Sequence, residues 1–208
     1  MNGILKDKVV IVTGGASGLG RATCIAAAEQ GARAVLVADV LAEPREGGEP
    51  THTMVQSIGS EGRFIETDVT NRSQVDALVS AAEDFGGVDV MVANAGITVA
   101  SDDADVSEED IDRMMSVNVK GVLLCAQAAA RQLKTAHKPG SIVLTASMGG
   151  LQGSPHTVAY STSKGGVIVM AKALAGALGP DGIRVNSVSP GLIETHMLTT
   201  TPRRRRGR

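Results

Sequence analysis

The stretch that decides the fold is KVVIVTGGASGLGRATCIAAAEQG, residues 8–31. Its first part, Lys8–Thr13, is a short β-branched run, which is typical of a buried strand. The glycine-rich turn Thr13–Gly20 follows, and Leu19–Gly31 then has the alanine-rich composition of a helix that a terminal glycine ends. The sequence therefore predicts a strand, a tight turn and a helix in direct succession.

The same alternation of short apolar runs and longer alanine-rich stretches continues along the chain. Further strands are expected at Ala34–Asp39, Arg63–Asp68, Val88–Asn94, Ser141–Ser147 and Ile183–Val188, and further helices at 51–58, 73–85, 108–135 and 158–178. Because the strands read as continuous apolar runs, both faces of their sheet should be covered. The pattern predicts one α/β domain with about six parallel strands and helices on both faces.

The composition excludes several classes of protein. No apolar run approaches the roughly 18–20 residues of a membrane span, and the N-terminal apolar stretch is too short for a secretory signal. Cys24 and Cys125 lie in apolar segments, so we expect buried free thiols and a cytoplasmic location. The four histidines do not cluster at ligand spacing, so no metal site is expected.

The formal net charge of −2 hides an uneven distribution of charge. Five arginines lie within the last six residues, so the rest of the chain is acidic and offers no surface for nucleic acid. We expect the Arg-rich tail, residues 199–208, to be disordered because it has no apolar content to pack. A tail that binds nucleic acid or another acidic partner is the alternative.

The glycine-rich turn is suited to binding a phosphate group. Glycine lets the backbone approach a ligand closely, and the N-terminus of the following helix offers N–H groups to a pyrophosphate. The spacing Gly14-x3-Gly18-x-Gly20 departs from the usual G-x-G-x-x-G, and a turn that serves packing alone is the alternative. The position of the turn between the first strand and the first helix favours a dinucleotide.

Asp39 ends the second expected strand. An acidic residue there can accept hydrogen bonds from ribose hydroxyls, and its charge repels a 2′-phosphate. We therefore expect the cofactor to be NAD rather than NADP, with Arg21 and Arg45 as the residues that could reverse this preference. A helix or turn cap is the alternative role for Asp39.

Tyr160 is the single tyrosine of the chain, and it lies four residues before Lys164 in an expected helix. The two side chains then share one helix face, where an ammonium lowers the pKa of a tyrosine from about 10 toward neutral and makes it a competent general acid and base. Ser147 ends the fifth expected strand, at the edge where α/β proteins bind ligands, and could hold a substrate oxygen. The four-residue spacing of Tyr160 and Lys164 could arise by chance. The argument therefore rests on the placement of the three residues at the ligand-binding edge, beside the glycine-rich turn.

The sequence resembles the short-chain dehydrogenase/reductases from about Lys6 to Leu198. The matching motifs are TGGASGLG (13–20), Asp39, Asp68-Val69, Asn94-Ala95-Gly96, Asn118 within SVNVKG, Ser147, Tyr160 and Lys164 within YSTSK, and RVNSVSPG (184–191) followed by Ile193 and Thr195. The resemblance implies a Rossmann-like doubly wound sheet over residues 1–198. It also implies an NAD-dependent enzyme that interconverts a secondary alcohol and a ketone.

The resemblance further implies a role for each matching residue. Tyr160 would exchange a proton with the substrate oxygen, which Ser147 would position. Lys164 would hold the nicotinamide ribose, and Asn118 would hold a water in a proton relay to it. The residues implied at the cofactor are Gly14, Ser17, Gly18, Leu19, Gly20, Asp39, Asp68, Val69, Asn94, Ala95, Gly96, Tyr160, Lys164, Pro190, Gly191, Ile193 and Thr195.

Two helical segments, Val117–Ala130 and Val167–Leu178, are apolar nearly all round, so we expect each to be buried on more than one side. The family usually pairs these helices between subunits. The resemblance therefore implies a homodimer or a homotetramer, with a small alcohol or ketone as the other partner and no membrane.

The chain departs from the family after the Pro190-Gly191 motif, where family members usually continue for several dozen residues. This sequence ends with TTTPRRRRGR. A truncated, catalytically impaired protein that still binds NAD is therefore one alternative function, a 3-oxoacyl thioester reductase is a second, and an interaction module is a third. The substrate itself is not predicted, because the residues that usually choose it lie after Thr195.

Overall fold

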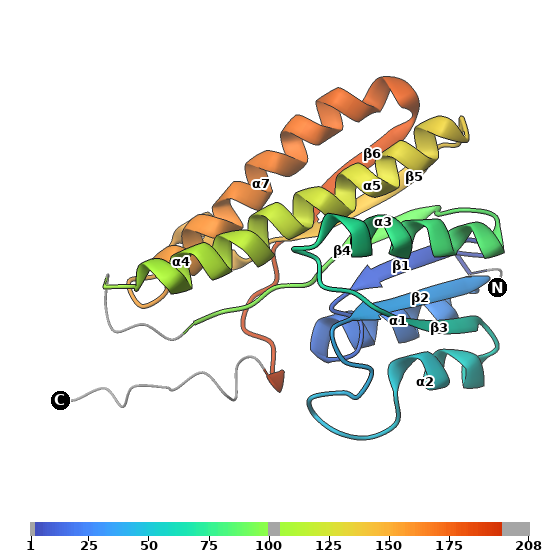
Figure 1. The fold of residues 1–208 in the computed structure, drawn as a ribbon, viewed down its shortest axis with the longest axis horizontal. Coiled ribbons are helices and arrows are strands. Elements are labelled where there is room, and N and C mark those ends of the chain that lie inside the picture. The colour runs from blue at the N-terminus through green and yellow to red at the C-terminus, as the bar shows by residue number, and fades with distance from the viewer. Residues whose placement is uncertain (1–2, 100–104, 197–208) are drawn as a thin grey trace.

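The computed structural model describes residues 3–99 and 105–196, and within them it forms one sheet of parallel strands flanked by helices (Figure 1). The strands are β1 (Val9–Thr13), β2 (Ala34–Asp39), β3 (Glu61–Glu66), β4 (Val90–Ala93), β5 (Gly140–Thr145) and β6 (Ile183–Val188). They lie in the order β3-β2-β1-β4-β5-β6, with every neighbouring pair parallel. This order is that of a doubly wound sheet, which reverses its direction of winding between β1 and β4.

Helices cover the two faces of the sheet unequally. The helices are α1 (Gly18–Glu29), α2 (Thr51–Ile58), α3 (Arg72–Ala81), α4 (Glu108–Met115), α5 (Val122–Thr135), α6 (Met148–Gln152) and α7 (Val158–Leu178). On one face α3, α5 and α7 build the larger core, whereas on the other α1 and α2 pack against β1, β2 and β3 (Figure 1). Along β6 buried residues alternate with exposed ones, so this strand is covered mainly on its α7 face.

The predicted fold class is confirmed, and the differences concern the ends of elements. β3 begins and ends two residues before the expected strand at 63–68, and β5 ends at Thr145 rather than Ser147. The long helix expected at 108–135 is divided by a π-helical turn, Ser116–Gly121, which separates α4 from α5. The short helix α6 was not expected, because its sequence MGGLQ has two glycines and little helical propensity.

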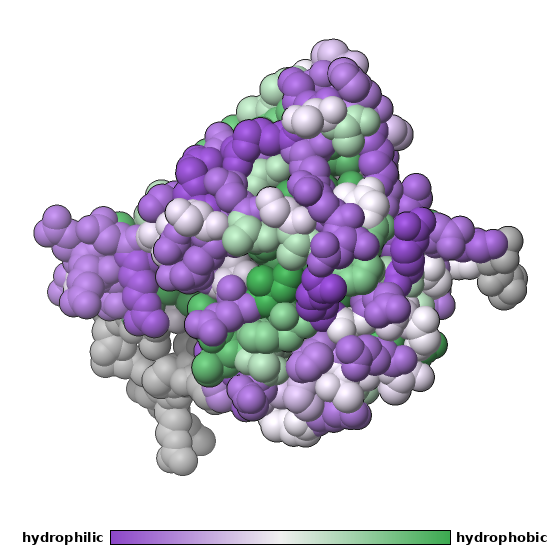
Figure 2. Space-filling view, turned by 45° about the vertical axis from the view of Figure 1, so that its right-hand side comes forward, coloured by the Kyte–Doolittle hydropathy of each residue, from purple (hydrophilic) through white to green (hydrophobic). Residues whose placement is uncertain are grey.

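Hydrophobic residues are concentrated in the interior of the protein. Val9 and Ile11 of β1 point into the larger core, while Val10 and Val12 point into the smaller one, as the period of a strand requires. The face of the molecule in Figure 2 is mostly hydrophilic, with hydrophobic residues gathered in a smaller area near its centre. Both cores are built from small aliphatic side chains, which accords with the near absence of aromatic residues.

Within residues 3–99 and 105–196, no helix is long and apolar enough to cross a membrane. In the same ranges, no three His, Cys, Asp or Glu side chains gather in a way that could hold a metal ion. The Arg-rich tail, residues 199–208, lies outside the described residues, so its expected disorder stays a prediction.

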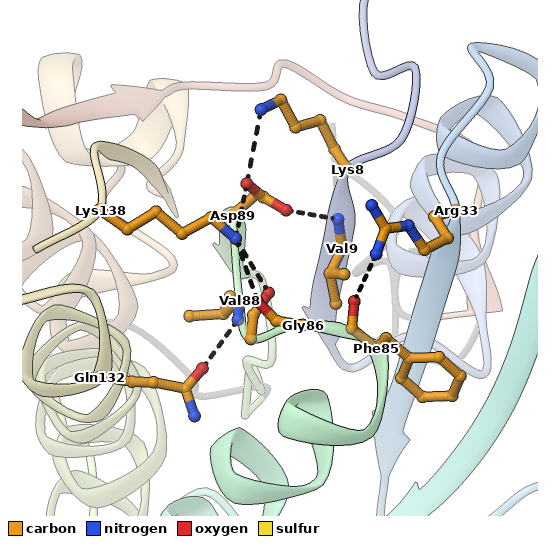
Figure 3. A network of polar contacts seen from close by, with 10 residues as sticks. Lys8, Val9, Arg33, Phe85, Gly86, Val88, Asp89, Gln132 and Lys138 are labelled. Carbon is orange, nitrogen blue, oxygen red and sulfur yellow. Dashed lines mark hydrogen bonds and ion pairs between the residues drawn. The ribbon is translucent and has the colours of Figure 1, made fainter. Parts of the chain in front are cut away.

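A buried carboxylate joins the amino-terminal ends of the central strands (Figure 3). The side chain of Asp89, just before β4, is 7% exposed and accepts a hydrogen bond from the Val9 N–H at 2.8 Å. Its other oxygen pairs with the ammonium groups of Lys138 at 2.9 Å and Lys8 at 3.5 Å. Burial by itself raises the pKa of Asp89, but the Val9 hydrogen bond, the bond and charge of Lys138 and the charge of Lys8 outweigh it and lower the pKa.

We expect Asp89→Asn to lower the free energy of unfolding by about 1–3 kcal/mol, because two cations lose their counter-ion and a buried N–H loses a charged acceptor. Since the pKa of Asp89 is lowered on folding from its ordinary 3.8, the advantage of the wild type should be full above that pH. It should shrink as the pH falls further. Urea unfolding at several pH values checks this, with the half-exposed Asp76 of the Asp76–Arg131 pair as the control: Asp76→Asn should change stability little. Equal losses for the two variants would contradict the prediction.

Candidate active site

The crevice of the sheet lies at the carboxyl ends of β1 and β4, where a doubly wound sheet binds ligands. Thr13, the last residue of β1, is buried there, and its Oγ1 accepts hydrogen bonds from the N–H groups of Asn94 (3.0 Å) and Ala95 (3.1 Å). The Asn94 amide donates to the Thr13 carbonyl at 3.0 Å in return. These bonds hold the segment from Asn94 to Gly96 beside the glycine-rich turn. Thr13 is a positioning residue, and its role in joining the two strands could not be predicted from the sequence.

The glycine-rich turn leads directly into α1. A Cβ built on Gly20 would lie 1.9 Å from the Gly14 carbonyl oxygen, so the helix can start this close to the turn only with glycine there. Ser17 precedes α1 at the N-cap position, yet its hydroxyl does not cap the helix. It accepts a hydrogen bond from the Arg45 backbone N–H at 2.8 Å instead. The loop after β2 is thereby fastened to the turn.

A cavity of about 460 Å³ lies over the N-terminus of α1, and its lining residues are Gly18, Leu19, Ala22, Glu46, Ile193, Glu194, Thr195 and His196. A Cβ built on Gly18 would lie 3.3 Å from the Thr195 methyl group, so the segment after β6 crosses this helix end. In that segment Gly191 is exposed and the Pro190 carbonyl accepts a hydrogen bond from the Met148 N–H at 3.0 Å. The cavity volume and the helix N-terminus fit the pyrophosphate of a dinucleotide.

Two acidic residues that the resemblance implies at the cofactor, Asp39 and Asp68, have local partners. Asp39 accepts hydrogen bonds from the N–H groups of Ala16 at 3.2 Å and of Val40 at 2.8 Å, so it also braces the glycine-rich turn. Asp68 is exposed and accepts from the N–H and hydroxyl of Thr70, both at 2.8 Å. Val69 beside it is buried, and a Cβ built on Gly121 would lie 2.7 Å from its methyl carbon.

One of the two arginines that could reverse the cofactor preference is directed elsewhere. The Arg21 guanidinium donates to the Thr51 hydroxyl at 2.9 Å and contacts the Met54 sulfur at 2.8 Å, both on α2. Arg45 is exposed in the loop after β2, where its backbone N–H is bound to Ser17. The Arg21 side chain therefore serves to join α1 to α2.

Tyr160 and Lys164 lie one turn apart on α7, and Ser147 caps α6 beside them. The Lys164 Nζ is 5.9 Å from the centroid of the Tyr160 ring. A Cβ built on Gly149 would lie 3.5 Å from the Ser147 Oγ and 3.7 Å from the Tyr160 Cε1, so the hydroxyl and the ring flank the same small space. The Ser147 Oγ accepts a hydrogen bond from the Gly149 N–H at 3.1 Å, which leaves its own proton to donate to a ligand.

Lys164 is buried, with 3% of its surface exposed, and this burial changes the pKa of its ammonium group. Its Nζ donates a hydrogen bond to the Thr145 carbonyl at 2.8 Å, and desolvation by burial lowers its pKa to about 8. A Cβ built on Gly96 would lie 3.2 Å from this Nζ and 3.2 Å from the Asn118 Oδ1. The Lys164 ammonium and the Asn118 amide therefore both lie against Gly96, where a larger residue would crowd both groups.

Asn118 is fully buried in the π-helical turn, and its side chain is committed to protein partners. Its Oδ1 accepts from the Ile97 N–H at 2.8 Å, and its Nδ2 donates to the Ile97 carbonyl at 2.9 Å and the Ser163 hydroxyl at 3.1 Å. Ser163, also buried and not singled out from the sequence, donates to the Tyr160 carbonyl at 2.7 Å. These bonds position α7 against the segment after β4, and the expected water relay through Asn118 stays a prediction.

Comparisons with known proteins identify the family of this chain. The family model described as short chain dehydrogenase matches residues 8–206. The chain is 40% identical over 200 residues to the mitochondrial (-)-isopiperitenol/(-)-carveol dehydrogenase of Mentha piperita, covering 94% of this chain and 73% of that protein. It is 39% identical over 199 residues to the cyclopentanol dehydrogenase of Comamonas testosteroni, covering 94% and 76%. The crystal structure of an NAD⁺-bound xylitol dehydrogenase superposes with a TM-score of 0.84 and 37% identity, covering 90% and 71%.

The lowered pKa of Lys164 predicts a distinct pH dependence of stability. Between pH 8 and its ordinary pKa of 10.5, the unfolded chain holds this proton while the folded chain releases it, so the free energy of unfolding rises with pH. Across this window we expect the free energy of unfolding of wild type to rise by up to roughly 3 kcal/mol more than that of Lys164→Met, since each pKa unit corresponds to about 1.36 kcal/mol. Urea unfolding from pH 7.5 to 10.5 measures the gain. Lys172→Met, at an exposed lysine of the same helix, should follow wild type, and parallel profiles for Lys164→Met would refute the lowered pKa.

Proposed function

Because the chain belongs to the short-chain dehydrogenase family, we propose that this enzyme transfers a hydride between NAD(H) and a secondary alcohol or its ketone. The observation that carries the proposal is the arrangement at one edge of the sheet. Ser147 and Tyr160 flank a small space there, with Lys164 one helical turn from Tyr160, and the helix N-terminus and the cavity suited to a pyrophosphate lie at the same edge.

The side chains divide the chemistry between them. The cofactor supplies the hydride acceptor or donor. Tyr160 exchanges the proton with the substrate oxygen as general acid or base, and the Ser147 hydroxyl donates a hydrogen bond that orients the same oxygen. Lys164, held by the Thr145 carbonyl, places a cation beside the phenol and would bind the ribose of the nicotinamide. Gly96 leaves room for the Lys164 ammonium and the Asn118 amide.

We propose NAD rather than NADP as the cofactor. The Asp39 carboxylate ends β2, next to the turn that would hold the adenosine half, and it repels a 2′-phosphate. Arg21 supports the same choice, since its guanidinium is bound to Thr51 and Met54 of α2. The NAD⁺-bound xylitol dehydrogenase, a similar structure, is consistent with this cofactor.

The substrate class is proposed from the relatives. Two of them are named for carveol or cyclopentanol, which are cyclic secondary alcohols. The space between Ser147 and Tyr160 offers one hydroxyl and one phenol to a single oxygen atom, which suits a simple alcohol or ketone group. A screen of cyclic and open-chain secondary alcohols with NAD is the direct way to identify the substrate.

We propose a homodimer or homotetramer that pairs α7 with its copy. The outward face of α7 carries the exposed residues Gly166, Val169, Ala173, Gly176 and Ala177. Val169 is 64% exposed, and no atom lies within 4 Å of a Cβ built on Gly166 or Gly176. A stripe of small and apolar residues allows two helices to approach closely, which supports this assembly.

The two cysteines support a cytoplasmic location. Cys24 and Cys125 are free and buried. Burial raises the pKa of both thiols, that of Cys125 to about 12, so neither is a reactive thiolate. Two inert, unpaired thiols are typical of a protein that works in a reducing compartment.

Tyr160→Phe tests the acid/base role. Removing the phenolic hydroxyl should lower turnover by about 10²–10⁴-fold, the usual contribution of general acid–base catalysis, while leaving NADH affinity nearly unchanged. Steady-state rates and NADH fluorescence titration measure the two effects. Thr135→Val, which removes a hydroxyl at the far end of α5, is the control. Retained turnover would refute the role, and wild-type protein that binds NADH but turns over no alcohol would favour the impaired alternative.

Asp39→Asn tests the cofactor preference. Wild type should bind NADH at least about tenfold more tightly than NADPH, a difference of about 1.4 kcal/mol, because the carboxylate repels the 2′-phosphate. The variant should narrow this ratio mainly by binding NADPH better, as fluorescence titration of both cofactors would show. Glu29→Gln removes the same charge at the far end of α1 and should leave the ratio unchanged. A wild-type preference for NADPH would overturn the assignment.

A further inference from the structure

The loop between β2 and α2 places a carboxylate on the N-terminus of α1. The Oε1 of Glu46 accepts a hydrogen bond from the Gly18 N–H at 2.6 Å. One residue earlier, the Arg45 N–H donates to the Ser17 hydroxyl at 2.8 Å. Two consecutive loop residues thus contact two consecutive residues at the start of α1, although they lie 28 positions apart in the sequence. Glu46 also lines the 460 Å³ cavity over this helix end.

The Gly18 N–H is a group that a bound pyrophosphate needs. Gly18 is the first residue of α1, and the first N–H groups of a helix have no partner within the helix. Together with the positive end of the helix dipole, they form the site at which dinucleotide phosphates bind. A carboxylate is an anion with acceptor oxygens, so Glu46 satisfies this donor much as a phosphate oxygen does.

We propose that Glu46 sets the affinity of the site for its dinucleotide by occupying the pyrophosphate position in the free protein. This inference rests on the proposed function, because it assumes that a dinucleotide binds over α1. The carboxylate and the pyrophosphate compete for the same N–H, and their like charges repel each other. Cofactor binding therefore requires Glu46 to leave, and its hydrogen bond to Gly18 lowers the apparent affinity.

The loop is built so that its tip can leave while its base stays. Pro44 is buried, which anchors the side of the loop that leads to Glu46. Glu46 itself is exposed, and the next two residues are Gly47 and Gly48. No atom lies within 4 Å of a Cβ built on either glycine, so the tip has open space beside it. Displacement of Glu46 therefore requires no rearrangement of the core.

The chain offers a matched control for charge alone. Glu49 is an exposed carboxylate in the same loop, three residues after Glu46. If the loop weakened cofactor binding only through its general negative charge, Glu49→Gln and Glu46→Gln would have the same effect. Only Glu46 accepts the hydrogen bond from Gly18 among the contacts of the described residues, so the two variants separate competition from general repulsion.

The experiment titrates NADH into wild type, Glu46→Gln, Glu46→Ala and Glu49→Gln, with fluorescence as the readout and circular dichroism to check folding. Both Glu46 variants should bind NADH about two- to fivefold more tightly, the usual effect of one charge at an exposed helix N-terminus. Glu49→Gln should match wild type. ADP-ribose, which has the pyrophosphate but no nicotinamide, should show the same gain by calorimetry, because the competition lies at the pyrophosphate.

Hydrogen exchange of the free protein gives a second readout. Glu46→Ala should speed amide exchange at the start of α1, because the Gly18 N–H loses its acceptor, whereas Glu49→Gln should not. Unchanged NADH affinity in the Glu46 variants, or an equal gain in Glu49→Gln, would overturn the inference while leaving the proposed function intact. A failure of all four proteins to bind NADH would refute the proposed function, and the inference with it.

Discussion

The hydrogen bonds between the Thr13 hydroxyl and the N–H groups of Asn94 and Ala95 are the interaction on which the site depends. They join β1 to β4 at the one place where the sheet reverses its winding, and so where a crevice can open between helices on opposite faces. Because every strand is parallel, every carboxyl end reaches this same edge. The glycine-rich turn, the Ser147 cap and the segment after β6 therefore meet there, where Gly18 lies against Thr195 and the Met148 N–H donates to the Pro190 carbonyl.

The two ends of the sheet carry polar groups with opposite effects on stability. At the amino end, the Asp89 carboxylate is paired with two lysines and favours the folded state. At the carboxyl end, Lys164 is buried and donates a hydrogen bond to the Thr145 carbonyl, and desolvation disfavours its charged form. Burying a cation lowers the stability of the folded state, but buried ionisable groups with a shifted pKa are common at functional sites. The stabilising ion pairs of Asp89 and the buried ammonium of Lys164 thus lie at opposite ends of the strands.

Features that depend on short-range spacing could be predicted from the sequence. The strands follow from continuous apolar runs, and the meeting of Tyr160 and Lys164 follows from the helical repeat. Contacts across long separations could not be predicted. The Glu46 carboxylate reaches Gly18 only because the loop after β2 folds back over α1, and nothing in its composition indicates that contact. The partners of Asn118 were also hidden, since they depend on how α7 packs against the segment after β4.

The π-helical turn at Ser116–Gly121 makes the number of residues between α4 and α5 matter more than their identities. A π turn holds one residue more than the α-helical turn it replaces. Without that residue the two helices would form one regular rod, and the downstream half would rotate by about 100° relative to the upstream half. Either Asn118 would leave Ile97, or Leu124 and Cys125 would leave the core. The extra residue therefore sets the rotation between the two halves, so that one helical segment binds Ile97 through Asn118 and packs Leu124 and Cys125 into the core.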